Sequence, residues 1–189
     1  AVLLEPPAVL VRLLPWIGPL SRRLADDQRT RRALGFVSMA TGIALGIYTG
    51  ILLSALGARP LWSSGLLGPL FLASGLSSSA AFAHWASPEP EERRQMAWLD
   101  NLFLVIELGL IGMLLIGLVS SSEAHAQAAG LLLGGPFTAV FWVGVVGLGI
   151  VVPLVIQSLA VSHRIIHTPI APILVMLGGL ALRFVIVSA

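Results

Sequence analysis

The sequence predicts an all-α fold, a polytopic bundle of transmembrane helices, from its composition, its low charge and its five long apolar runs. Of the 189 residues, 57% are hydrophobic and only 11% are charged, and the mean hydropathy is +0.95. Soluble domains carry roughly 25% charged residues, so this protein lacks the polar residues of an ordinary water-facing surface. The net charge is only +2, so the isoelectric point near 10.4 does not indicate binding to nucleic acid.

The first 33 residues are predicted to form an interfacial or cytoplasmic connector. Residues 8–20 are apolar, but one arginine and two prolines interrupt this run, and it is too short to cross the hydrocarbon core. Residues 21–32 hold five arginines and two aspartates. We therefore expect this stretch to lie at the lipid headgroups.

Residues 34–189 are predicted to form the transmembrane bundle, because each of five runs reaches about the 20 apolar residues that a span needs. The first, second and fourth runs carry no charge. The third contains Asp100 and Glu107, and the fifth contains Arg183. The five predicted spans are about residues 34–56, 61–84, 97–119, 137–160 and 169–189.

The arginines predict the orientation of these spans. Alternating spans place nine of the 11 basic residues on one side of the membrane, and positive charge accumulates on the cytoplasmic side. The amino-terminal segment is therefore predicted to be cytoplasmic, with the carboxyl end outside. The nine residues are Arg12, Arg22, Arg23, Arg29, Arg31, Arg32, Arg93, Arg94 and Arg164.

Asp100 and Glu107 are candidate proton-transfer residues. They are seven positions apart, so they project from nearly the same helix face. A charge as deep as Glu107 costs at least ~2.5 kcal/mol, so its side chain should face the bundle interior or a water-filled cavity. Water would have to bridge the roughly 10 Å between the two residues along the helix. In the alternative interpretation, Glu107 only fixes helix packing and Asp100 lies at a solvated helix start.

Tyr48, Arg59 and Arg183 are further candidate polar contacts. Tyr48 is the single tyrosine and lies mid-span, so its hydroxyl needs either a structural or a functional partner. Arg183 cannot lose its proton, so it either extends to the interface, pairs with an acid, or binds an anionic or carbonyl group.

No haem, metal or iron–sulfur cluster is expected in this protein. The sequence has no cysteine, which excludes thiolate ligands and covalently attached haem. His84, His163 and His167 lie at predicted helix ends, whereas b-type haem needs histidines that face each other within the membrane.

A series of short motifs extends over roughly residues 34–189. The motifs are Tyr48-Thr49-Gly50, Leu52-Leu53-Ser54, Ala58-Arg59-Pro60-Leu61-Trp62, Gly68-Pro69-Leu70-Phe71, Ser74-Gly75, Leu99-Asp100, Ile106-Glu107-Leu108, Gly135-Pro136-Phe137, Phe141-Trp142, Pro153-Leu154, Gly178-Gly179-Leu180 and Leu182-Arg183. In content and order, this series resembles the NrfD/PsrC family, the membrane subunits of polysulfide reductase and related complexes.

The resemblance implies a quinone-binding subunit, for menaquinone or ubiquinone, in a bacterial or archaeal cytoplasmic membrane. Family members carry no redox cofactor of their own. They contact an iron–sulfur subunit on the outer face and, through it, a molybdopterin or haem catalytic subunit. The family's quinone-site tyrosine matches Tyr48. The five spans resemble the last five helices of an eight-helix fold, whose first helices contribute further polar quinone ligands.

Two other functions stay open, a structural membrane anchor and a transporter subunit without quinone chemistry. A transporter is expected to show internal repeats and broken helices at mid-membrane. The five spans show no clear repeat, although Pro153 is positioned to kink the fourth. A pure anchor would have no reason to keep Glu107 inside the membrane.

Overall fold

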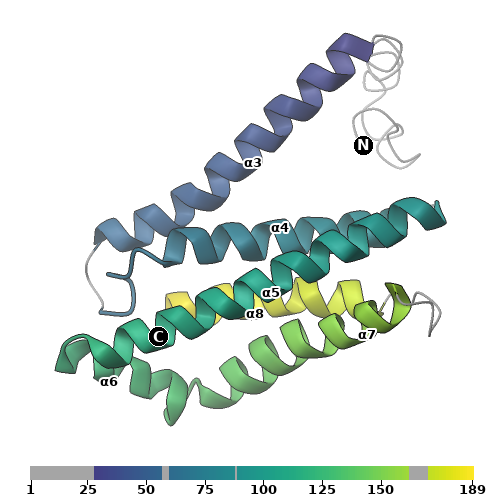
Figure 1. Cartoon of the computed structure of the whole chain (residues 1–189). Helices are drawn as coiled ribbons and strands as arrows, with labels where there is room; N and C mark the ends of the chain where they lie inside the picture. The colour runs from purple at the N-terminus through teal and green to yellow at the C-terminus, as the bar shows by residue number, and fades with distance from the viewer. Residues whose placement is uncertain (1–27, 57–59, 88, 162–169) are drawn as a thin grey trace, which may run out of the picture. The chain divides into compact units, whose positions relative to one another are not determined.

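The computed structural model describes residues 28–56, 60–87, 89–161 and 170–189, and all the secondary structure in these ranges is helical (Figure 1). The protein forms two compact units, residues 1–45 and residues 46–189. The connector predicted for residues 1–33 lies almost wholly outside the described ranges, so it stays a prediction.

Four of the described helices are long and apolar enough to span a membrane, which confirms the predicted all-α membrane bundle. The segments that meet these criteria are Arg32–Ala55, Glu91–Ser120, Val140–Ala160 and Ile170–Ser188. The second predicted span, residues 61–84, corresponds to α4 (Leu67–Ala86). It is not among the four because its four serines and His84 lower its hydropathy.

Helix α3 (Gln28–Leu56) begins in the first unit and ends in the second. It starts six residues before the predicted span, because arginines and alanine are good helix formers and continue the helix into the polar segment. Within the second unit, Gly46 and Gly50 allow a close approach to α4. A Cβ atom on Gly46 would lie 3.2 Å from Leu72 Cδ1, and one on Gly50 would overlap the backbone of Gly68.

The second unit is a bundle built from α4, α5 (Pro90–Ser120), the π-helix η1 (Val140–Val151), α7 (Val152–Val161) and α8 (Ile170–Ser188). Helix α4 packs against α5 and α8, α7 packs against α5, and η1 packs against α8 (Figure 1). Leucine, isoleucine, valine and phenylalanine side chains fill the space between them. Close packing in this core explains why the helices stay together when lipid provides no hydrophobic force between them.

Helix α5 starts seven residues before the predicted span. Pro90 occupies its first turn, followed by Glu91 and Glu92, and this sequence suits a helix amino terminus. Proline lacks an N–H group, but N–H groups in the first turn have no partner within the helix. The negative charges of the two glutamates interact favourably with the positive end of the helix dipole. Ser87 Oγ donates to Glu92 Oε2 at 2.6 Å, and Arg93 Nε donates to the Ser87 carbonyl at 2.6 Å. These bonds place the helix start well outside the apolar stretch.

The predicted loop after the third span contains a helix that the sequence analysis did not anticipate, α6 (Glu123–Leu133). His125 on this helix bonds Ser122 Oγ through Nδ1 at 2.7 Å and Ser63 Oγ through Nε2 at 2.8 Å. In the same unit, Trp62 Nε1 donates to the Ile186 carbonyl at 2.8 Å. These contacts join the turn before α4 to α6 and to the end of α8.

The fourth predicted span is present as two continuous pieces, η1 followed by α7. A π-helix of 12 residues is unusual, since most occur as single turns inside α-helices. Three glycines lie in it, and Gly149 meets Gly178 of α8 so closely that a Cβ on Gly149 would be 2.6 Å from Gly178 Cα. Two glycines at one crossing let the backbones touch.

Candidate functional site

The second unit contains a group of buried polar side chains in a largely apolar interior, and this polar cluster is the candidate site. Its members come from four elements, α4, α5, α7 and α8. They are Ser74, Ser77, Asp100, Glu107, Gln157 and the half-buried Arg183. The sequence analysis selected only three of these residues, Asp100, Glu107 and Arg183. Buried polar groups at membrane depth are costly unless they have partners, so a cluster of them is a functional hypothesis by default.

Asp100 is fully buried, with 0% of it exposed, and three helices meet at its carboxyl group. Ser77 Oγ on α4 donates to Oδ1 at 2.8 Å, and Gln157 Nε2 on α7 donates to Oδ2 at 2.6 Å. The alternative of a solvated helix start is therefore wrong for Asp100. It fails because α5 begins at Pro90, which puts Asp100 about three turns inside the helix.

Glu107 lies on the same face of α5, about two turns further along, and only 3% of it is exposed. Arg183 on α8 and Asp100 act on it electrostatically. The buried Ser74 Oγ on α4 has no hydrogen-bond partner among the described residues. The structure thus places both predicted carboxyl groups in the bundle interior, as the sequence analysis expected for Glu107. Their roles in proton transfer stay a prediction.

Arg183 folds back along α8 and does not extend toward the carboxyl end of the helix. Its Nη1 donates to the Gly179 carbonyl, one turn earlier, at 2.9 Å. The guanidinium lies against glycines: a Cβ on Gly75 of α4 would be 3.6 Å from Nη2, and one on Gly179 would be 3.2 Å from Nη1. The missing side chains of these two glycines make room for the cation between α4 and α8.

Tyr48 differs from the polar cluster in its surroundings. It is on α3, and 60% of it is exposed. No hydrogen bond to its hydroxyl is found among the described residues, so the partner that the sequence analysis expected is not part of the described fold. Arg59, His163 and His167 lie outside the described residues.

Ser77, Gln157 and His125 are among the residues with specific contacts that escaped the sequence analysis. Gln157 is a single amide in a long uncharged run, and nothing in the local pattern marks it. His125 follows Ser122 by three positions at the start of α6, a spacing that brings two side chains together on a helical turn. Within the described ranges no three histidine, aspartate or glutamate side chains group in a way that could hold a metal ion.

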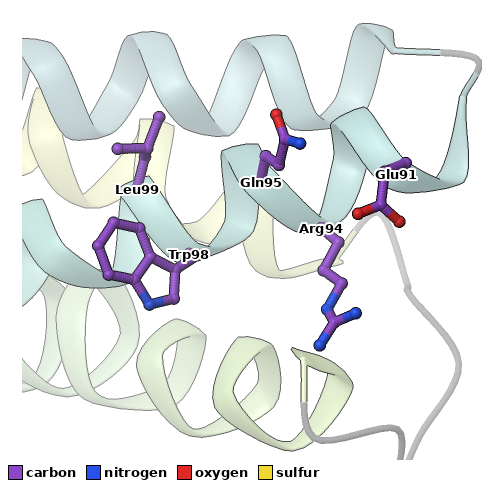
Figure 2. Close-up of a pocket in the computed structure, with 5 residues that line it drawn as sticks. All are labelled: Glu91, Arg94, Gln95, Trp98 and Leu99. Atoms are coloured by element: carbon purple, nitrogen blue, oxygen red, sulfur yellow. The ribbon is translucent and has the colours of Figure 1, made fainter.

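A surface groove of about 270 Å³ lies along the first turns of α5 (Figure 2). Five residues line it, on one face of the helix: Glu91, Arg94, Gln95, Trp98 and Leu99. Arg94 and Glu91 extend in the same general direction in Figure 2, so the groove presents opposite charges next to an indole ring. The groove opens widely to the surface of α5.

Comparison with known proteins identifies relatives over nearly the whole sequence. The family described as "Polysulphide reductase, NrfD" matches residues 2–189. A polysulfide reductase polypeptide of Wolinella succinogenes is 33% identical over 84% of the present sequence and 53% of its own length. Protein NrfD of Escherichia coli is 32% identical over 96% of the present sequence and 60% of its own length.

A selenate reductase polypeptide of Mesobacillus selenatarsenatis is more distant, 28% identical over 86% of the present sequence and 40% of its own length. The sequence therefore spans about half to three fifths of the two more similar relatives. No solved structure matches it significantly.

Proposed function

Since this chain belongs to the NrfD family, whose members are membrane subunits of respiratory reductase complexes, we propose that it binds quinone or quinol for such a complex. In this proposal an iron–sulfur subunit exchanges electrons with the quinone and passes them to or from a molybdopterin or haem catalytic subunit. The amino-terminal segment lies on the cytoplasmic side of a bacterial or archaeal cytoplasmic membrane. Quinone, either menaquinone or ubiquinone, is the membrane-soluble substrate.

The observation that carries this proposal is the burial of Asp100 and Glu107 on one face of α5. Reduction of a quinone consumes two protons together with two electrons, and oxidation of a quinol releases them. A protein that does this chemistry inside a membrane needs titratable groups that lead protons to water. A purely structural anchor has no such need, and buried ionisable groups in spans are costly to keep.

Tyr48 is the proposed contact to quinone. Its ring is exposed on an apolar helix surface, so a substrate dissolved in the bilayer can reach it without first entering the protein core. Its hydroxyl can donate a hydrogen bond to a quinone carbonyl. Arg59 and Arg183 are proposed as further polar contacts for carbonyl or anionic groups.

The test is the variant Glu107→Gln, which keeps the shape of the side chain and removes its proton. In the assembled complex we expect quinone-linked turnover to fall by roughly 10²-fold, the lower limit of what a proton-transfer group contributes. Slower proton uptake should accompany the loss, and the amount of complex in the membrane should be unchanged.

Glu123→Gln is the matched control, because Glu123 is an exposed acid at the start of α6. We expect it to leave turnover unaltered. Equal turnover in Glu107→Gln and the wild type would reduce Glu107 to a packing residue and favour the structural anchor.

A further inference from the structure

Gln157 is a buried polar residue that the proposed function does not yet use. Only 1% of it is exposed, and its amide Nε2 donates to Asp100 Oδ2 at 2.6 Å. The other end of the amide, Oε1, is buried and has no hydrogen-bond partner among the described residues. One side chain thus holds Asp100 with its donor and presents an unused acceptor in the bundle interior.

A buried acceptor without a donor costs about 1–3 kcal/mol, so native proteins leave few of them unsatisfied. The usual solution inside a protein is an ordered water molecule, which binds where two or more polar atoms converge. Gln157 Oε1 lies near the Asp100 carboxylate, because the same amide group donates its Nε2 proton to Asp100 Oδ2. Both Oε1 and the carboxylate are strong acceptors. A water molecule can donate to both, since it has two protons.

From this geometry we propose that Gln157 is a positioning residue, which fixes Asp100 and binds an internal water molecule that connects Asp100 toward Glu107. The proposal rests on the proton path under the proposed function. In one transfer the water receives a proton from Asp100 and gives a different proton onward toward Glu107. The water is unchanged at the end, and no electron moves.

An amide suits this position because it offers a donor and an acceptor at opposite ends. When Asp100 is ionised, Nε2 donates to it, as in the structure. When Asp100 carries a proton, one of its oxygens can still accept from Nε2 while the protonated oxygen donates to the water molecule that Oε1 binds. Ser77 Oγ stays available to Oδ1 in both states, since a hydroxyl can donate or accept. Gln157 therefore fits both protonation states without a change in the helices.

Two variants of the assembled complex separate this role from simple packing. Gln157→Met has nearly the same length and no polar group, so it removes both ends of the amide. Gln157→Glu keeps an acceptor and, when protonated, a donor. For packing alone, an apolar methionine is tolerated better than a buried acid. For positioning, we expect the opposite order, with turnover roughly tenfold lower in Gln157→Met and largely retained in Gln157→Glu.

Infrared difference spectroscopy supplies the second readout. The carboxyl band of Asp100, identified by its loss in Asp100→Asn, should shift in Gln157→Met, and bands sensitive to H₂¹⁸O should disappear with it. Ser158→Ala is the matched control, because the adjacent Ser158 is exposed and bonds its own helix at the Val155 carbonyl. That variant should match the wild type in both measurements.

The results distinguish the two levels of the proposal. Normal turnover and an unshifted Asp100 band in Gln157→Met would overturn the role of Gln157, even if Glu107→Gln remains slow. Normal turnover in Glu107→Gln would instead remove the proton path itself. A higher turnover in Gln157→Met than in Gln157→Glu would assign Gln157 to packing.

Discussion

The end of α3 and the α4–α8 bundle differ in how far they expose their candidate functional side chains. On α3, Tyr48 is 60% exposed and lies close in sequence to the exposed apolar residues Ile51 and Leu52. In the bundle, Asp100 and Glu107 are almost completely enclosed, and partners on α4 and α7 bond Asp100 directly. One region leaves the hydroxyl-bearing ring of Tyr48 exposed, and the other encloses a hydrogen-bonded network.

This contrast indicates which species can reach each region. A large, lipid-soluble molecule can contact an exposed ring on an apolar helix, whereas the buried carboxyl groups of Asp100 and Glu107 are out of its reach. Protons need only hydrogen-bonded groups and water, so the proposed function routes them through that interior. The division therefore agrees with quinone contact at α3 and proton transfer inside the bundle, the two tasks that the proposed function requires.

The largest expected effect comes from the packing that encloses the network. Gly178→Leu places a side chain where Gly149 of η1 already touches α8, an overlap that neither backbone can relieve. Overpacking in a core costs typically about 1–3 kcal/mol and more when backbone must move. We expect the complex to be lost from the membrane, as measured by quantitative immunoblotting.

Gly109→Leu is the control for that experiment, since no atom of the described residues lies within 4 Å of a Cβ at this position. It should accumulate normally. Normal accumulation of Gly178→Leu would mean that the enclosure of the bundle does not depend on this crossing.

An intermediate effect is expected at the exposed region. Tyr48→Phe removes one hydroxyl and keeps the ring, so a hydrogen bond of about 1 kcal/mol is lost while packing is unchanged. That predicts roughly a five- to tenfold weaker response to quinone, measured as an increase in KM or in the inhibitor concentration needed for half-inhibition. The amount of assembled complex should not change.

Thr41→Val provides the matched control, because Thr41 Oγ1 bonds the Val37 carbonyl of its own helix. If Tyr48→Phe and Thr41→Val behave alike, the hydroxyl of Tyr48 has no contact with quinone. The assignment of quinone binding to α3 would then be wrong.

The smallest effect is expected at the end of the bundle, where His125 joins Ser63 to Ser122. His125→Phe removes two exposed hydrogen bonds whose net value is about 1 kcal/mol. The melting temperature of the complex should fall by roughly 2–4 °C, while turnover stays normal. A loss of turnover without a change in melting temperature would contradict a purely structural role for this contact.

The sequence predicts the apolar spans well but places their ends less accurately. Apolar runs identify α3, α4, α5, η1 with α7, and α8, because a helix that crosses the hydrocarbon core needs a long run of predominantly apolar residues. The start of α5 is predicted seven residues too late because its first turns are polar and begin at Pro90. Residues of α6 are expected to form a loop, since a short alanine-rich helix has no span-length signal.

The candidate site is only partly predictable for a similar reason. Glu107 is recognisable because an acid inside an apolar run is rare, and the structure does bury it. Gln157 carries no charge, and its importance arises only from its contact with Asp100, 57 residues away in sequence. Contacts of this kind depend on how helices pack, which no local pattern records.

The π-helix before α7 has a consequence for how this span tolerates change in length. Each residue of an α-helix turns the backbone by about 100°, so one residue inserted or removed within Val140–Val151 would rotate Gln157 away from Asp100 by a comparable angle. The span would remain as apolar as before. The contact between Gln157 and Asp100 thus depends on the number of residues in η1, which sets the direction in which Gln157 points. Substitutions among valine, leucine and isoleucine in η1 should therefore be neutral, whereas single-residue insertions should not.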